Sequence, residues 1–311
     1  MTRSPATSPA TSSATSPATA AAKSGDSSPR ISFEFFPPAP GAPEERFWET
    51  AERLNALGPD FCSVTYGAGG TTKDRTFEIV TGLNRRGIDT AAHLTLVGAT
   101  RGEVDAVARS LAEAGVRRLV ALRGDMPNMA GGFEAHPEGY RSSVELIGRL
   151  REIADFDISV GAYPETHPNA ASPEADVAYL KRKLDAGAAR AVTQYCFDPE
   201  VFLRFRDRAQ AAGIDKPLVA GVLPVTNFAK LLEFSAKCGA GVPAWLHERF
   251  ADLDDDPETR SLVAAHTAAE LCQRLMSEGV EEFHFYTLNR ANLSYAVCRL
   301  LGIRPALQEA A

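Results

Sequence analysis

Eight short runs of β-forming residues recur along the chain, and segments with helical spacing of apolar residues separate them. The runs are Ile31–Phe36, Phe61–Tyr66, Thr90–Leu96, Arg117–Arg123, Asp157–Tyr163, Arg190–Cys196, Pro217–Leu223 and Glu281–Leu288. A helix between successive strands brings those strands into parallel pairing through crossover connections. Eight such units favour a closed barrel over an open doubly wound sheet. We therefore expect an α/β fold, a single-domain (β/α)8 TIM barrel.

The expected barrel covers residues 31–305, and two tails of different composition flank it. Residues 1–30 repeat Ser-Pro-Ala-Thr and contain no large apolar side chain apart from Met1, so we expect a disordered low-complexity tail. This segment has neither an amphipathic Arg-rich face nor an apolar core, which argues against a targeting peptide. Residues 306–311 are expected to form a short C-terminal tail.

The spacing of the strands breaks once, between the seventh and the eighth. About sixty residues lie there, enough for a helix over Asn227–Cys238, further structure, and a long helix near Glu258–Ser277. The acidic run Asp254–Asp256 before Pro257 is typical of a capped helix start. A metal site is the alternative interpretation, and we expect none.

Composition excludes several functional classes. The formal net charge is −7, and phosphate-backbone binding requires clustered excess Lys and Arg, so no nucleic-acid partner is expected. No apolar run approaches the roughly 20 residues that a membrane span needs, so no membrane partner is expected either. The five cysteines are scattered without CxxC or zinc spacing. We expect buried reduced thiols and a cytoplasmic location.

Active sites of such barrels form at the carboxyl ends of the strands, so polar residues there are the candidates. The sequence has no Walker loop, HExxH or GxSxG pattern, and these residues alone therefore do not name a reaction. The candidates are Glu34, Thr65, Tyr66, His93, Thr95, Arg123, Asp125, Tyr163, Glu165, His167, Gln194, Asn227 and the segment from Tyr286 to Arg290.

Glu34 is an acid in an aromatic strand. Strand alternation puts Glu34 on one face with Ser32 and Phe36, and puts Phe33 and Phe35 on the other. A glutamate that faces the packed lumen would have a raised pKa, which suits a general acid. The alternative is a structural glutamate paired with a buried Arg or Lys.

Two loops carry further candidates. Arg123-Gly124-Asp125 combines a glycine that permits close backbone approach with an Arg able to grip a phosphate or carboxylate, although many such turns are plain loops. Tyr163-Pro164-Glu165-x-His167-Pro168 puts an aromatic, an acid and an imidazole on one stiffened loop. The alternative role of His167 is to cap the loop locally, and the alternative role of His93 is that of a buried core histidine.

Several sequence blocks occur in one fixed order from about Ile31 to Pro305. Together they resemble the FAD-dependent bacterial methylenetetrahydrofolate reductase family. The blocks are Phe33–Pro38, Ser63–Ala68, His93–Thr95, Ala121–Asp125, Ala162–Pro168, Asp176–Lys183, Asp185–Ala188, Thr193–Gln194, Gly221–Val225 and Phe283–Arg290.

The resemblance implies an oxidoreductase of one-carbon metabolism with noncovalent FAD. In that family a nicotinamide cofactor, NADH favoured over NADPH, reduces the flavin and leaves. 5,10-Methylenetetrahydrofolate then takes its place and receives a hydride from flavin N5, which completes a ping-pong cycle. The product is 5-methyltetrahydrofolate. The resemblance further implies a homo-oligomer.

The resemblance also assigns roles to single residues. Glu34 would protonate the folate ring nitrogen and Asp125 would stabilise the developing cation and tune the flavin. Arg182 and Lys183 would hold the pyrophosphate. The implied substrate residues are Gln194, Lys230, Phe234, Tyr286 and Arg290. The implied FAD residues are Thr65, Tyr66, His93, Arg123, Gly124, Asp125, Tyr140, Arg141, Tyr163, His167, Ala170, Asp176, Tyr179, Arg182, Lys183 and Ala188.

Four features depart from the family pattern. Ala92 stands where proline is common, Tyr179 replaces an asparagine, Lys230 replaces a glutamine, and Met126–Gly139 is longer than in the enterobacterial type. These departures bear on substrate affinity and nicotinamide preference. Two alternatives stay open: a proline-dehydrogenase-like flavin barrel, and a barrel that binds flavin or folate without turnover.

Overall fold

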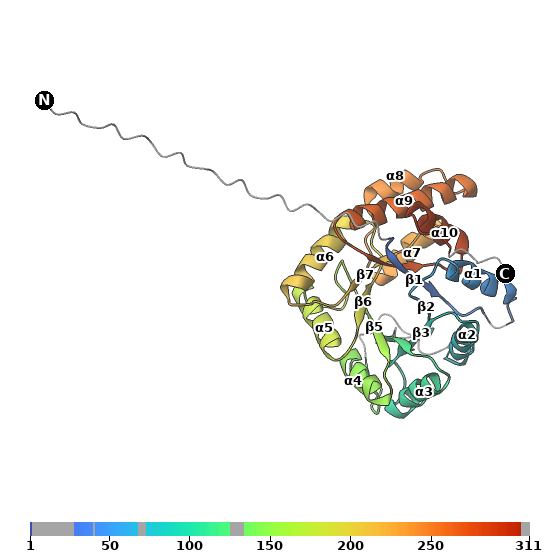
Figure 1. Ribbon diagram of the computed structural model, residues 1–311, viewed down its shortest axis with the longest axis vertical. Helices are drawn as coiled ribbons and strands as arrows, with labels where there is room; N and C mark the ends of the chain where they lie inside the picture. Colours follow the sequence, from blue (N-terminus) through green and yellow to red (C-terminus); the bar gives the residue numbers. More distant parts are fainter. Residues whose placement is uncertain (2–27, 40, 68–72, 125–133, 306–311) are drawn as a thin grey trace.

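A computed structural model describes Met1 and residues 28–39, 41–67, 73–124 and 134–305. Eight strands pair in sequence order, each parallel to its neighbours, and β1 pairs with β8. The expected closed (β/α)8 barrel is thus confirmed (Figure 1). The strands are β1 (Arg30–Phe35), β2 (Phe61–Val64), β3 (Thr90–Thr95), β4 (Arg118–Leu122), β5 (Asp157–Ala162), β6 (Arg190–Thr193), β7 (Leu218–Val222) and β8 (Glu282–Tyr286).

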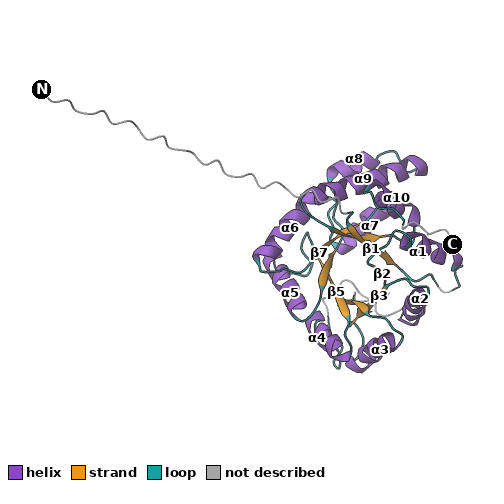
Figure 2. Cartoon of the chain, in the orientation of Figure 1, coloured by secondary structure: helices purple, strands orange, loops and turns teal. Residues whose placement is uncertain are grey.

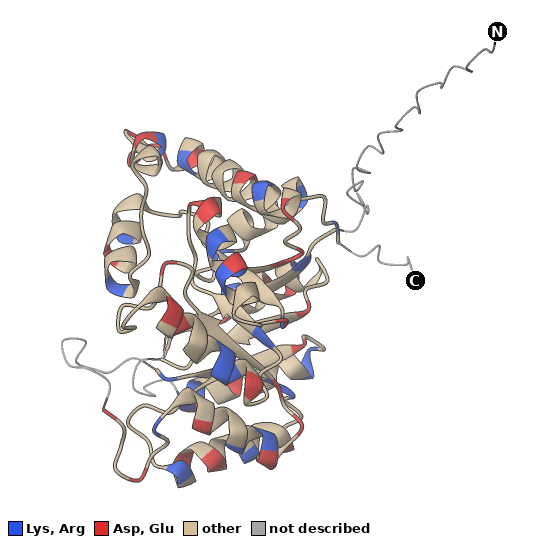
Figure 3. Cartoon of the chain, turned by 90° about the vertical axis from the view of Figure 1, so that its left-hand side faces the viewer, with Lys and Arg blue, Asp and Glu red and all other residues tan. Residues whose placement is uncertain are grey.

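Helices form a ring around the strands (Figure 2). Basic and acidic positions are interspersed along them rather than gathered by sign (Figure 3). The helices are α1 (Glu45–Asn55), α2 (Lys73–Arg85), α3 (Arg101–Glu113), α4 (Ser143–Ile153), α5 (Pro173–Asp185), α6 (Pro199–Ala211), α7 (Phe228–Cys238), α8 (Ala244–Phe250), α9 (Pro257–Ser277) and α10 (Ala291–Leu300).

All eight predicted strands are present, and no strand begins or ends more than three residues from its predicted bound. The largest difference is at β6, which ends at Thr193 and not at Cys196. Gln194 still donates its N–H to Ala162 O at 2.8 Å. Beyond it, the Gln194 side chain accepts from Tyr195 N at 3.1 Å, so a side chain replaces the neighbouring strand as partner.

The alternation predicted for β1 is confirmed. Phe33 and Phe35 are fully buried between the sheet and the helices, and the Phe33 ring lies 5.9 Å from that of Phe285. Ser32 and Glu34 occupy the opposite face, which lines the barrel interior. The aromatic residues thus supply the outer core and leave the interior of β1 free for polar groups.

The long connection between β7 and β8 contains α7, α8 and α9. Asp256 accepts from Thr259 N at 3.0 Å and Pro257 opens α9, as the acidic run predicted. The short helix α8 was not predicted. Four cysteines are buried and unpaired as expected, whereas Cys238 is only half-buried.

The predicted tails mostly lie outside the described residues, which leave out 2–27 and 306–311. The first strand begins at Arg30, one residue before the predicted start of the barrel. Among the described residues, no helix has both the length and the apolarity to cross a bilayer, and no group of three or more His, Cys, Asp or Glu side chains is arranged to hold a metal ion.

Candidate active site

A cavity of about 910 Å³ opens at the carboxyl ends of the strands. Every strand or the loop after it contributes to its wall, so the site depends on closure of the barrel. Most of the predicted site residues line this cavity. They are Glu34, Thr65, Tyr66, His93, Arg123, Gly124, Arg141, Tyr163, His167, Ala170, Asp176, Tyr179, Lys183, Gln194, Lys230, Phe234 and Tyr286.

Four of the described residues that the resemblance assigns to FAD or substrate do not line it. Tyr140 is buried, and its hydroxyl donates to Asp105 at 2.5 Å. Ala188 is buried before the amino end of β6, away from the carboxyl ends where the cavity opens. The side chains of Arg182 and Arg290 are exposed outside the cavity wall, and Arg290 precedes α10.

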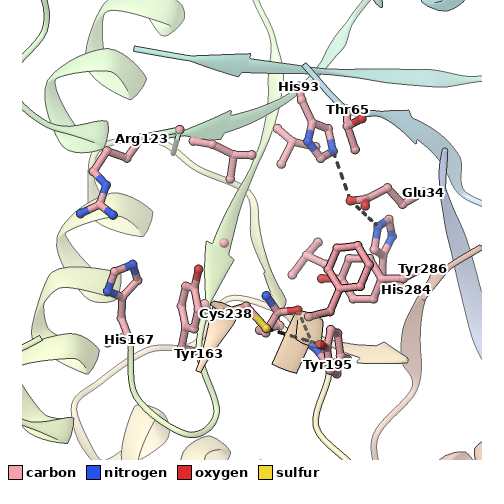
Figure 4. A pocket seen from close by; sticks show the side chains of 18 of the residues that line it. Glu34, Thr65, His93, Arg123, Tyr163, His167, Tyr195, Cys238, His284 and Tyr286 are labelled. Atoms are coloured by element: carbon pink, nitrogen blue, oxygen red, sulfur yellow. Dashed lines mark hydrogen bonds and ion pairs between the residues drawn. The ribbon is translucent and has the colours of Figure 1, made fainter. Parts of the chain in front are cut away.

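Glu34 faces the cavity beside two imidazoles (Figure 4). Its Oε2 lies 3.5 Å from His93 Nε2 and 3.9 Å from His284 Nε2. The Glu34 carbonyl accepts from Thr287 Oγ1 at 2.6 Å, which fixes the end of β1. Within the described part of the chain, the ionisable side chains within 4 Å of the Glu34 carboxylate are these histidines, and no Arg or Lys lies that close. The alternative of an Arg- or Lys-paired structural glutamate does not fit this arrangement.

The two histidines differ in their surroundings. Burial lowers the pKa of His93, and the nearby Glu34 opposes this only in part. His93 is therefore neutral at pH 7, and its buried Nε2 has no hydrogen-bond partner among the described residues. His284 Nδ1 lies 2.7 Å from Ser32 Oγ, which orients its ring toward Glu34. An unsatisfied buried nitrogen beside a carboxylate is the kind of group that a ligand satisfies.

His284 was not among the predicted site residues. It stands two positions before Tyr286 on β8, and strand alternation puts both on the interior face. Applying that period to Tyr286 would have found it. Tyr286 itself donates to Thr193 O at 2.7 Å. Burial, reinforced by Glu34, raises the pKa of Tyr286 well above its ordinary value, so the phenol stays protonated.

Lys183 supplies a cation on the α5 side of the cavity. Its ammonium donates to Gly161 O. Desolvation lowers the pKa of Lys183 to about 8, although Asp176 pulls in the opposite direction. Asp176 accepts from His167 N at 2.8 Å, and the His167 ring lies 4.5 Å from that of Tyr163. A desolvated ammonium on a cavity wall is suited to an anionic ligand group such as phosphate.

The backbone conformation at position 124 requires glycine. Its φ is +85°, and a Cβ there would lie 2.6 Å from Val97 Cγ1 and 2.8 Å from Thr95 Cβ. Only glycine fits this turn without displacing its neighbours. Asp125, the predicted second catalytic residue, and residues 126–133 lie outside the described residues.

Helix α7 forms the wall on the other side. Asn227 caps it by accepting from Lys230 N at 2.8 Å. Phe234 projects from α7 at the cavity mouth with 57% of its surface exposed, unusual for a large aromatic side chain. Cys238 was expected to be buried, but it is the last residue of α7 and lines the cavity. Its Sγ lies 3.4 Å from Tyr195 Oη.

These features define a barrel enzyme in which a carboxylate and two imidazoles face a large cavity that also holds a desolvated cation. Residues 19–302 match the family model described as Methylenetetrahydrofolate reductase. The chain belongs to that family.

Relatives from bacteria and a plant agree with this assignment. The chain is 50% identical over 278 residues to 5,10-methylenetetrahydrofolate reductase of Escherichia coli K12, covering 89% of this chain and 92% of the relative. Identity to the Salmonella typhimurium LT2 protein of that name is 49% with the same coverage. It is 34% to Methylenetetrahydrofolate reductase (NADH) 1 of Arabidopsis thaliana, covering 88% of this chain but 48% of that protein.

Proposed function

We propose that this chain reduces 5,10-methylenetetrahydrofolate to 5-methyltetrahydrofolate with FAD and a nicotinamide cofactor in a ping-pong cycle. Membership of the family supports the reaction class. The observation that carries the mechanism is Glu34, a carboxylate on the interior face of β1 that opens onto the cavity beside the neutral His93.

The residues of the cavity fit FAD. His93 Nε2 is an unsatisfied buried nitrogen, and Lys183 puts a desolvated ammonium on the cavity wall, where a phosphate would supply its counter-charge. When bound, FAD supplies reversible hydride transfer. The residues proposed to hold it are Thr65, Tyr66, His93, Arg123, Gly124, Arg141, Tyr163, His167, Ala170, Asp176, Tyr179 and Lys183. Contacts from Asp125, Tyr140, Arg182 and Ala188 stay predictions.

The protein groups act on the folate by proton transfer and orientation. Glu34 is proposed to deliver a proton to the folate ring nitrogen, because opening of that ring requires one. The imidazole of His93, whose pKa is lowered by burial, lies beside this carboxyl group. Gln194 and Phe234 both line the cavity and are proposed to orient the ligand and to stack on it, respectively. Lys230, which lines the cavity, would contact its polar end. A contact from Arg290, whose side chain lies outside the cavity wall, stays a prediction.

NADH is the proposed reductant in preference to NADPH. The Arabidopsis thaliana relative is named as an NADH enzyme. A homo-oligomeric state and a cytoplasmic location are part of the same proposal. Family membership favours this reaction over a proline-dehydrogenase-like activity, and a barrel that binds flavin or folate without turnover is an outcome of the test below.

The test starts from purified protein freed of cofactor. Addition of FAD is expected to restore the yellow flavoprotein, and steady-state rates with NADH and methylenetetrahydrofolate should give parallel double-reciprocal lines. Failure to take up FAD would refute the proposal. Uptake of FAD without turnover would identify a binding module instead.

A further inference from the structure

Glu165 has no part in the roles assigned so far, although it lies in the same loop as Tyr163 and His167. Its Oε2 accepts from the backbone N–H of Gly241 at 2.7 Å. The two residues are 76 positions apart in the sequence. This hydrogen bond therefore joins the loop after β5 to the segment that follows α7. An ionised acceptor makes such a bond stronger than one between neutral groups.

Glycines at the end of α7 let the two segments meet. Gly239 ends the helix with a φ of +74°, and a Cβ there would lie 2.7 Å from Pro168 Cγ. A Cβ on Gly241 would lie 2.4 Å from Glu165 Oε1. At Gly239 the near atom belongs to a proline ring, whereas at Gly241 it is the end of the flexible Glu165 side chain, which a Cβ would displace. The backbone after α7 therefore lies directly against the loop. The loop and the helix end thus pack closely at two places, Gly239 against Pro168 and Gly241 against Glu165.

Tyr195 attaches the same helix end from a second direction. Its hydroxyl lies 3.1 Å from Ser235 Oγ and 3.4 Å from Cys238 Sγ. Figure 4 shows Tyr195 and Cys238 in contact on the side of the cavity that also carries Tyr163. Helix α7 is thus held at its carboxyl end by the ends of β5 and β6.

The part of α7 that faces the cavity lies just before this attachment. Phe234 is one turn, and Lys230 two turns, before Cys238, and both line the cavity. Phe234 is 57% exposed, so packing against neighbours does little to fix its position. The position of its ring depends on where the helix end is held.

We propose that Glu165 is a positioning residue, whose carboxylate fixes the end of α7 on the loop after β5 and so holds Phe234 over the cavity. As far as Phe234 contacts NADH and folate, this inference rests on the proposed function. The loop that carries FAD-binding residues and the helix that carries substrate-binding residues then move as one unit. Loss of Glu165 should weaken binding of both substrates more than it slows either hydride transfer.

The experiment compares Glu165→Ala, Glu165→Gln and the control Glu233→Ala in the full-length protein with FAD. Glu233 is an exposed acid on α7 that does not line the cavity, so its loss changes charge without touching the contact. Hydrogen exchange over residues 228–241 is measured together with kcat and KM for NADH and methylenetetrahydrofolate.

Glu165→Ala is expected to speed hydrogen exchange at 228–241 by about tenfold, the size of one charge-assisted hydrogen bond. It should raise both KM values several-fold with a smaller change in kcat. Glu165→Gln keeps an oxygen that accepts from Gly241 N but loses the charge, so its hydrogen exchange and KM values should lie between those of wild type and Glu165→Ala. Glu233→Ala should behave like wild type. If Glu165→Ala does not fold, Gly241→Ala displaces the carboxylate and is expected to give the same result.

Unchanged exchange and unchanged KM in Glu165→Ala would overturn the inference. So would an equal loss in Glu165→Gln and Glu165→Ala, because that pattern reports charge and not the hydrogen bond. Hydrogen exchange needs no turnover, so it tests the contact even if wild-type protein fails to reduce methylenetetrahydrofolate. Failure of the proposed function and failure of this inference are thus separate outcomes.

Discussion

The proposed contact between Lys183 and a phosphate of FAD predicts that FAD affinity falls as the pH rises from 7 to 9. In the cofactor-free protein the pKa of Lys183 is lowered to about 8 by desolvation, against about 10.4 in water. A phosphate beside the ammonium favours the charged form, so FAD binding takes up a proton wherever free Lys183 is neutral. About nine-tenths of Lys183 is charged at pH 7 and about one-tenth at pH 9, which predicts roughly tenfold weaker FAD binding at pH 9.

The dissociation constant is measured from quenching of FAD fluorescence by cofactor-free protein between pH 7 and pH 9. Lys183→Arg keeps its charge over this range and should give a flat profile, while Lys183→Met should bind weakly at every pH. Stability of the cofactor-free protein should change with the opposite sign. Its unfolded state binds more protons between pH 8 and about 10, so the free energy of unfolding rises there from this group. A wild-type affinity that stays constant from pH 7 to pH 9 would refute the reasoning.

Three further substitutions separate chemistry from architecture. Glu34→Gln should still allow NADH to reduce the flavin but lower the rate of folate reduction by about 10²–10⁴-fold; equal loss in both half-reactions would refute the acid assignment. Asp125→Asn should shift the flavin potential and weaken folate turnover, and unchanged values of both would remove Asp125 from the site. Gly221→Ala puts a Cβ 2.1 Å from Thr193 O, so thermal unfolding should report a loss of about 1–3 kcal/mol; an unaltered melting temperature would contradict the contact.

Periodic patterns made much of the fold predictable. Few topologies are compatible with eight β-forming runs that are separated by helical segments. In the closed barrel, each helical segment connects two adjacent parallel strands. The two-residue period of β1 assigned Glu34 to the interior and Phe33 to the outer core, as observed. The cap at Asp256 was predictable because its acceptor and donor lie three residues apart.

Contacts between distant segments were not predictable in this way. The hydrogen bond from Gly241 to Glu165 depends on how α7 returns to the barrel. The half-burial of Cys238 depends on the position of Tyr195, 43 residues away. A cysteine with apolar neighbours in the sequence is buried in most cases, but not in every case. At the end of a helix that borders a cavity, such a side chain can face the cavity instead.

In the proposed mechanism, this cavity brings reduced FAD and a one-carbon folate together for hydride transfer, and Glu34 supplies the proton. The most direct test of this mechanism mixes NADH-reduced, FAD-loaded protein with methylenetetrahydrofolate in the absence of oxygen and of free NADH. We expect the flavin absorbance to return in a single turnover, with one 5-methyltetrahydrofolate formed per flavin, and Glu34→Gln to stay reduced under the same conditions. Reduced flavin that persists in the wild-type protein, or reoxidises without forming methyltetrahydrofolate, would contradict the account.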